Sequence, residues 1–168
     1  GGKYALELTK AGFHVDGINR SEGHLQYALD HGYIASGKTH DFEDLVQQAD
    51  HIIFGLYPTA LLEWFKAYGP LLKPGCIFTD VSGVKTGLVE PVQAMCPAGV
   101  EFIASHPMAG RETSSVEHAV EVNFAPANFI ITPTEKNTPE AIQWLRELAE
   151  VLGFHHICTL TVQEHDKM

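Results

Sequence analysis

Short apolar runs alternate with segments of helical periodicity along most of this 168-residue chain, and this alternation limits its fold more than any other feature. Residues 51–56 are almost continuously apolar, which is typical of a strand buried on both faces of a parallel sheet. Helices are predicted at 3–11, 22–30, 41–48, 59–68, 86–95 and 139–152, and strands at 13–18, 51–56, 76–81, 101–104, 128–132 and 154–158. Repeated strand–helix–strand order with short turns implies right-handed crossovers. We therefore predict an α/β fold with a doubly wound, mostly parallel sheet.

Residues that favour helix ends support these boundaries. Gly12 follows the first predicted helix, where a left-handed residue commonly ends one. Ser21 is a suitable N-cap for the helix at 22–30, and Asp41 or His40 for the helix at 41–48. Pro58 precedes the helix at 59–68 and fits its first turn.

Composition excludes several classes of function. Lys and Arg total 11 against 21 for Asp and Glu, a formal charge of -10, and the basic residues are scattered, so nucleic acid is a poor partner. No apolar run of about 18 residues suggests a membrane span, and no secretory signal is visible. Cys76, Cys96 and Cys158 form neither a metal knuckle nor a disulfide framework, and the ten His lie mostly singly, so we expect no metal site and a cytoplasmic protein.

The chain opens with Gly1 and Gly2 directly at the start of a predicted helix. A doubly wound sheet that binds a nucleotide normally begins with a strand and a glycine-rich turn before that helix. We therefore expect the first strand and part of its turn to be missing from this sequence, although a tag remnant would leave the same glycine pair.

Ligands of such sheets bind beyond the carboxyl ends of the strands, and Asn19, Arg20 and Ser21 follow the first predicted strand. Domains that select NAD usually carry an acid here, which accepts hydrogen bonds from the ribose. Asn19 is neutral, whereas Arg20 and Ser21 can bind a 2′-phosphate. These residues favour NADP over NAD; the alternative is a surface Arg with Ser21 only capping a helix.

Two further strand ends are candidate ligand sites. Leu56, Tyr57 and Pro58 would face a dinucleotide, unless they form an ordinary strand-to-helix turn. The segment from Asp80 through Ser82 to Lys85 contains small residues that permit close approach of a ligand. Lys85 could meet a carboxylate or simply begin a helix.

The segment 105–115 is polar, and Pro and Gly restrict its backbone. Its histidine, His106, has an ordinary pKa of about 6.5 and can exchange protons near neutral pH. Position alone leaves two interpretations open, a catalytic histidine and a structural one.

The residues HPMAG at 106–110, preceded by TDVSGVK at 79–85, resemble the prephenate dehydrogenase family of tyrosine biosynthesis, which includes arogenate-using relatives. The residues EHD at 164–166 are similar to the family's entry into a helical C-terminal domain, and Gly1 and Gly2 to the end of its glycine-rich loop, with Gly1 as the third fingerprint glycine. The resemblance covers essentially the whole chain.

This resemblance implies an oxidative decarboxylation of prephenate. A hydride leaves C4 for the nicotinamide of NADP or NAD, the ring carboxylate departs as carbon dioxide, and the product is 4-hydroxyphenylpyruvate, or tyrosine from arogenate. His106 would accept the proton of the C4 hydroxyl as charge develops. Asp80 and Ser82 would lie at the cofactor, and Ser82 and Lys85 at the substrate.

Two motifs depart from the family pattern. The family commonly has Gly-Ser before Val-Lys, whereas this chain has Ser82-Gly83, so the serine expected beside the substrate is displaced by one position. After the HPMAG block the family often has Thr-Glu-Lys-Ser. Here Arg111, Glu112 and Ser114 would line a substrate pocket of altered polarity.

The resemblance also implies a domain division. Residues 1–160 would form the dinucleotide-binding domain, and 161–168 would begin a helical domain that forms a homodimer and binds a substrate carboxylate. We therefore expect the chain alone to be an incompetent enzyme. Two alternatives to a prephenate or arogenate dehydrogenase are another NADP-linked reductase, against which the HPMAG segment speaks, and a non-catalytic nucleotide-binding module, which leaves His106 without a purpose.

Overall fold

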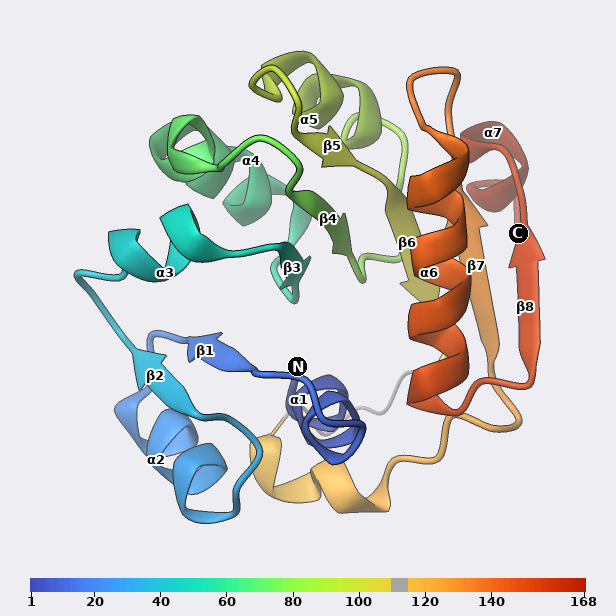
Figure 1. Cartoon of the computed structure of the whole chain (residues 1–168). Coiled ribbons are helices and arrows are strands. Elements are labelled where there is room, and N and C mark those ends of the chain that lie inside the picture. The colour runs from blue at the N-terminus through green and yellow to red at the C-terminus, as the bar shows by residue number, and fades with distance from the viewer. Residues whose placement is uncertain (110–114) are drawn as a thin grey trace.

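The computed structural model describes residues 1–109 and 115–168, in which helices surround a set of short, mostly parallel strands (Figure 1). The strands are β1 (Asp16–Ile18), β2 (Ser36–Lys38), β3 (His51–Phe54), β4 (Ile77–Asp80), β5 (Glu101–Phe102), β6 (Ala104–Pro107), β7 (Asn128–Thr132) and β8 (His156–Thr159). The α-helices are α1 (Gly2–Lys10), α2 (Glu22–Asp30), α3 (Glu43–Gln48), α4 (Pro58–Tyr68), α5 (Val89–Met95), α6 (Pro139–Leu152) and α7 (Val162–His165), with 3-10 helices η1 (Gly69–Leu71) and η2 (Val116–Glu121).

The strands pair in three groups. β1 pairs with β2 in parallel, β3, β4 and β5 form a second parallel group, and β6, β7 and β8 form the third. Within the third group β6 and β7 are antiparallel, whereas β7 and β8 are parallel. The predicted α/β class with a mostly parallel sheet is therefore confirmed.

The run of residues 101–107 joins the second group to the third. Its first part, β5, pairs with β4, and its second part, β6, pairs with β7. Between them the Ile103 amide donates to the Phe78 carbonyl at 3.1 Å, so the run stays beside β4 as it changes partner. This run carries His106 to the carboxyl edge of β4.

Three clusters of apolar side chains hold the helices against the strands. Phe65 of α4 stacks on Phe78 of β4, which in turn stacks on Phe102 of β5. Helix α6 lies lengthwise over β6, β7 and β8 in Figure 1, and its buried Leu145 belongs to the same cluster as Phe129 of β7. A third, smaller cluster joins α1 and α2. None of the helices in the described part of the chain combines the length and the apolar character required to cross a membrane.

Several local predictions can be checked against the helix ends. The Ser21 hydroxyl accepts the His24 amide, so Ser21 caps α2 as expected, and Pro58 lies in the first turn of α4. Gly12 follows α1 with a φ of +94°. The predicted cap of α3 is wrong: Asp41 has a φ of +52°, which is incompatible with a capping conformation, and α3 begins after Phe42.

Candidate active site

The loops after β4 and β6 meet at one edge of the sheet, because β4 runs parallel to β5 and β6 continues the same run. Asp80 is the last residue of β4, and His106 lies near the end of β6. These two strand ends place the predicted catalytic histidine beside the segment of residues 80–85. Ligands of open α/β sheets bind at such an edge.

Lys85 does meet a carboxylate, but it is the internal carboxylate of Asp80. Its Nζ lies 2.9 and 2.7 Å from the two Asp80 oxygens and 2.6 Å from the Ser105 carbonyl oxygen, and both charged side chains are fully buried. These acceptors engage the three donors of the ammonium group. Burial lowers the pKa of Lys85, and the Asp80 carboxylate opposes that shift. In this geometry the Lys85 ammonium group is engaged by internal acceptors beneath the strand end that carries His106.

The same carboxylate fixes the end of β6. Asp80 Oδ1 accepts the Ser105 amide at 3.2 Å, and the Ser105 hydroxyl donates to the Asp80 carbonyl at 2.9 Å. The Thr79 hydroxyl lies 2.8 Å from that of Ser105. Because the residue before His106 is held at several points, the imidazole is presented at a defined place.

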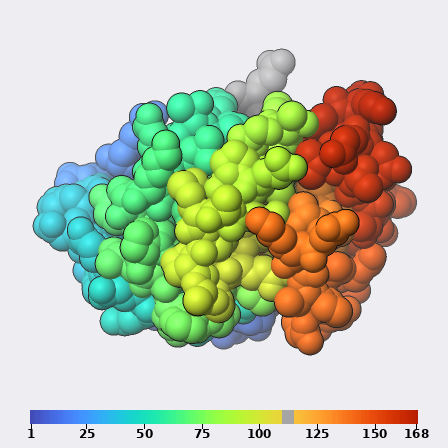
Figure 2. Space-filling model, turned by 90° about the horizontal axis from the view of Figure 1, so that it is seen from above, coloured from blue at the N-terminus to red at the C-terminus, as the bar shows by residue number. Residues whose placement is uncertain are grey.

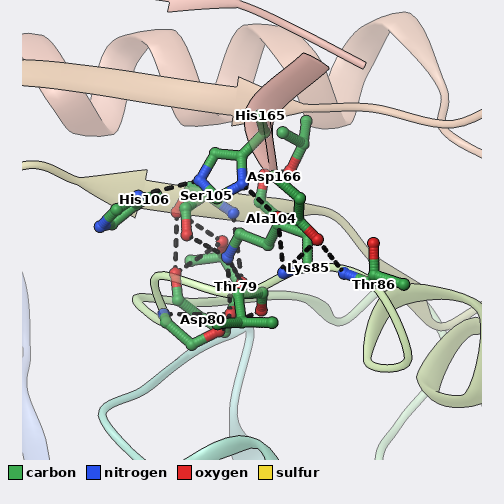
Figure 3. A network of polar contacts seen from close by, with 12 residues as sticks. Thr79, Asp80, Lys85, Thr86, Ala104, Ser105, His106, His165 and Asp166 are labelled. Carbon is green, nitrogen blue, oxygen red and sulfur yellow. Dashed lines mark hydrogen bonds and ion pairs between the residues drawn. The ribbon is translucent and has the colours of Figure 1, made fainter. Parts of the chain in front are cut away.

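His106 is half-buried and contacts a second histidine. Its Nδ1 lies 2.9 Å from Nε2 of His165, and His165 Nδ1 lies 2.6 Å from Oδ1 of Asp166 (Figure 3). His165 is only 3% exposed. Burial, together with His165 and the Lys85 ammonium, lowers the pKa of His106. The imidazole is therefore neutral at neutral pH, as a proton acceptor must be.

Asp166 connects this histidine pair to the loop after β4. Its carboxylate accepts the Lys85 amide at 3.1 Å and the Thr86 amide at 2.6 Å. In Figure 2 the C-terminal residues, in red, lie beside the yellow-green part of the chain. Burial favours the neutral acid, but hydrogen bonds from Thr86, His165 and Lys85 outweigh it and hold the pKa of Asp166 well below its ordinary value of 3.8.

A glycine lies beside the other ring nitrogen of His106. A Cβ atom added to Gly83 would lie 3.5 Å from both Cε1 and Nε2 of His106. The Ser82 hydroxyl instead lies 2.8 Å from Asp80 Oδ2 and 2.9 Å from the Val84 carbonyl oxygen. The order Ser82-Gly83 therefore leaves the Nε2 side of the imidazole uncovered by a side chain from this loop.

The residues that we expect to bind the nucleotide follow other strands. The Asn19 side chain accepts the Ser21 amide at 2.9 Å, so these two residues form a turn that also caps α2. Arg20 is exposed, and no hydrogen bond or ion pair joins its guanidinium to another described residue. The structure thus shows the capping role of Ser21 and leaves the Arg20 guanidinium available for a ligand.

The remaining cofactor candidates lie at helix starts. Tyr57, which follows Leu56 after β3, is 87% exposed and is the N-cap residue of α4, and Pro58 is its first residue. Gly1 is the N-cap residue of α1, and a Cβ atom on Gly2 would lie 3.1 Å from a methyl carbon of Val116. The absence of a side chain at Gly2 thus allows α1 to pack closely on η2.

Three predicted substrate residues, Arg111, Glu112 and Ser114, lie outside the described residues. In residues 1–109 and 115–168, no group of three or more His, Cys, Asp or Glu side chains is placed to hold a metal ion. His165 was not singled out from the sequence as part of the site, because every histidine except His106 was interpreted as exposed or hydrogen-bonded. The signal that could have identified it is the triplet Glu164-His165-Asp166, which was connected only with a domain boundary.

Known proteins resemble this chain in sequence and in fold. The family model of the prephenate dehydrogenase nucleotide-binding domain matches residues 4–158. The prephenate dehydrogenase of Bacillus subtilis is 29% identical over 171 residues, covering 99% of this chain and 45% of that protein. This chain therefore spans less than half of that relative.

Two solved structures share the fold over nearly the whole chain. The prephenate dehydrogenase of Aquifex aeolicus superimposes with a TM-score of 0.87 at 25% identity, covering 98% of this chain and 59% of that one. The arogenate dehydrogenase of Synechocystis gives a TM-score of 0.86 at 28% identity, covering 99% of this chain and 58% of that one. With a family model matched over most of its length, the chain belongs to the prephenate dehydrogenase family.

Proposed function

We propose that this chain is the nucleotide-binding part of an enzyme that oxidatively decarboxylates prephenate to 4-hydroxyphenylpyruvate in tyrosine biosynthesis, with NADP as the preferred hydride acceptor. The observation that carries the proposal is the half-buried imidazole of His106, whose pKa is lowered by burial and whose Nε2 is left open beside Gly83. Because the chain spans 45% of its Bacillus subtilis relative, the activity is proposed for the whole protein.

The geometry supports a proton-acceptor role for His106. A neutral imidazole accepts the proton of the substrate's C4 hydroxyl as the C4–H bond is lost, which stabilises the charge that develops on that oxygen. Asp80 and Lys85 hold the strand end that presents this imidazole. The bound nicotinamide supplies the hydride acceptor, and loss of the ring carboxylate as carbon dioxide makes the ring aromatic.

The cofactor-binding part of the proposal rests on the ends of β1, β3 and β4. The exposed Arg20 guanidinium can pair with a 2′-phosphate, and Asn19 places no carboxylate there to repel it. The glycine pair at the start of α1 suits close approach of a pyrophosphate to a helix N-terminus. The backbone of residues 56–58 and the segment from Asp80 to Ser82 would border the dinucleotide.

The substrate pocket, the assembly and the location follow from the family resemblance. We propose that Ser82 borders the substrate and that Arg111, Glu112 and Ser114 line its pocket. Residues 161–168 would begin the substrate-binding and dimer-forming part, and the enzyme would act as a cytoplasmic homodimer.

The test combines cofactor titration with turnover. NADP and NAD are titrated in parallel by calorimetry, and formation of reduced cofactor is followed with prephenate and with arogenate in the whole protein. We expect tighter NADP binding and turnover of prephenate. The 168-residue chain by itself should turn over far more slowly, and turnover comparable to that of a full-length relative would refute this expectation.

A variant of the histidine separates an enzyme from a non-catalytic module. His106→Asn should abolish turnover and leave nucleotide affinity nearly unchanged, whereas the exposed His155→Asn serves as the matched control and should change neither. Loss of nucleotide binding in His106→Asn would place His106 in the cofactor site or in the core and would contradict the proposed role.

A further inference from the structure

Three side chains form a hydrogen-bonded row that ends at His106: the Asp166 carboxylate, the His165 imidazole and the His106 imidazole (Figure 3). We infer that Asp166 and His165 are positioning residues that fix the tautomer of His106, with the proton on Nδ1 and a free electron pair on Nε2. This inference rests on the proposed function for its chemical consequence, but its geometry stands independently.

The row begins with a group that can only accept. Asp166 already receives two backbone amides, from Lys85 and Thr86, and hydrogen bonds to the charged form keep it ionised at neutral pH. An ionised carboxylate has no proton to donate. The contact of 2.6 Å with His165 therefore requires a proton on His165 Nδ1.

The direction of the next hydrogen bond follows from the first. A neutral imidazole carries one N–H donor and one acceptor nitrogen, so a proton on Nδ1 leaves Nε2 of His165 as an acceptor. Nε2 lies 2.9 Å from Nδ1 of His106, which must then donate. His165 is 3% exposed, so water does not compete freely for either nitrogen.

The last member of the row is thereby left with its electron pair on Nε2. This nitrogen faces Gly83, where an added Cβ atom would lie 3.5 Å away. Because glycine has no side chain, residue 83 leaves the nitrogen uncovered. In the opposite tautomer Nε2 would carry a proton and could not accept one from a hydroxyl. The row thus determines whether His106 can act as a base.

Other charged groups near His106 do not replace this control. Asp80 and Lys85 form a buried ion pair behind β6, and both influence the pKa of His106 through space. Neither forms a hydrogen bond with a nitrogen of the His106 ring among the described residues. The tautomer is therefore set from the side of His165 and Asp166.

The test is a direct observation of the imidazole nitrogens. Long-range 1H–15N correlation spectra of the uniformly 15N-labelled protein, without substrate, are recorded at pH 8, above the ordinary imidazole pKa of about 6.5. We expect a protonated Nδ1 and an unprotonated Nε2 on both His106 and His165. A proton on Nε2 of His106, or a mixture of tautomers, would overturn the inference.

Variants then distinguish a residue that fixes the tautomer of His106 from one that only stabilises the fold. Asp166→Asn can keep its oxygen on the Thr86 amide only by turning its NH2 group toward His165 Nδ1. His165 Nδ1 must then accept and Nε2 must donate, so the proton of His106 should move to Nε2. In the whole protein kcat should fall about 100-fold while the KM for the cofactor stays nearly constant, as expected when only the orientation of a base is lost. The control is Asp44→Asn, which makes the same change in an exposed carboxylate that is paired with Lys38. It should leave the spectrum of His106 unchanged.

The two proposals fail in distinguishable ways. A protein that lacks prephenate turnover but shows the expected tautomer contradicts the proposed function and leaves this inference intact. An active protein whose His106 carries its proton on Nε2 contradicts this inference, and with it the role of Nε2 as the base, but leaves the proposed activity intact. Because the wild-type spectrum decides the tautomer, the result does not depend on whether the Asp166→Asn variant folds.

Discussion

The ammonium group of Lys85 is held between both carboxylate oxygens of Asp80, at 2.9 and 2.7 Å, with neither side chain exposed to solvent. A charge pair taken out of water is stable only while both partners remain, because the survivor would be a buried, uncompensated charge. This pair also supports the strand end that presents His106, since Asp80 accepts the Ser105 amide.

Removal of the ammonium group alone should therefore be costly. Lys85→Met leaves the Asp80 carboxylate buried and unpaired, and we expect the free energy of unfolding to fall by about 3–5 kcal/mol. Urea denaturation followed by circular dichroism measures the change. Lys66→Met, at an exposed position of α4, should change it by no more than about 0.5 kcal/mol.

The double variant Asp80→Asn with Lys85→Met checks the cause. Removing both charges eliminates the unpaired carboxylate, so the double variant should be more stable than Lys85→Met. A double variant no more stable than Lys85→Met would show that packing of the lysine stem, and not the charge, is what matters.

The pH dependence of turnover should report the environment of His106. Burial, His165 and Lys85 lower the pKa of His106 below its ordinary 6.5, so the neutral, proton-accepting form persists to more acidic pH than for a free imidazole. As the pH falls, kcat/KM should therefore decline with a midpoint below 6.5. Steady-state rates of the whole protein across the acid range test this, and a midpoint above 6.5 would contradict the lowered pKa.

Gly83 should tolerate a methyl group but not a branched side chain. Its φ lies outside the left-handed region, and a Cβ atom would make only ordinary contacts with His106 at 3.5 Å, so Gly83→Ala should alter the free energy of unfolding by less than about 1 kcal/mol. Gly83→Val adds methyl groups beside Nε2 and should lower kcat/KM at least about tenfold, which corresponds to about 1.4 kcal/mol in the barrier. Equal rates for the two variants would show that the substrate does not approach Nε2 from this side.

Arg20 should determine the choice between the two nicotinamide cofactors. Arg20→Ala removes charge-assisted hydrogen bonds to a 2′-phosphate, each contributing about 1.5–3 kcal/mol, so NADP affinity should fall about tenfold to a hundredfold. NAD affinity should stay nearly constant because NAD has no such phosphate. Parallel calorimetric titrations measure both affinities. The matched control is Arg146→Ala, because the Arg146 guanidinium donates to the exposed Thr159 hydroxyl instead. An equal loss for both cofactors would refute the phosphate contact.

Long periodic segments could be predicted from the sequence, because burial of one helix face or of both strand faces leaves a regular pattern. Residues 22–30, 128–132 and 139–152 match α2, β7 and α6 at both ends. The strand at 36–38 was missed because Ser, Gly and Lys carry no apolar pattern, and its pairing with β1 comes from the tertiary structure. The helix η2 was missed for a similar reason, since its six residues present only one fully buried apolar side chain, Ala119.

Candidate site residues could be predicted where they directly follow a strand. They could not be predicted where segments far apart in the sequence come into contact. Position marked His106 and Asp80 only as candidates, because the ends of parallel strands share one edge of the sheet, and the family resemblance supplied their predicted roles. His165 is 59 residues from His106 in the chain, and its contact arises only when α7 packs beside the loop after β4. The burial of Lys85 was equally hidden, since a lysine in a short polar loop gives no sign of an internal partner.

The change of partner along residues 101–107 has a consequence for how this segment can vary. Alternate residues of a strand point to opposite faces, so buried Ser105 and half-buried His106 depend on the strand's alignment with β4 and β7. Inserting or deleting one residue between β5 and β6 would exchange the two faces and turn the imidazole away from His165. Substitutions at neighbouring positions preserve that alignment, so this stretch should accept changes of side chain far more readily than any change of length.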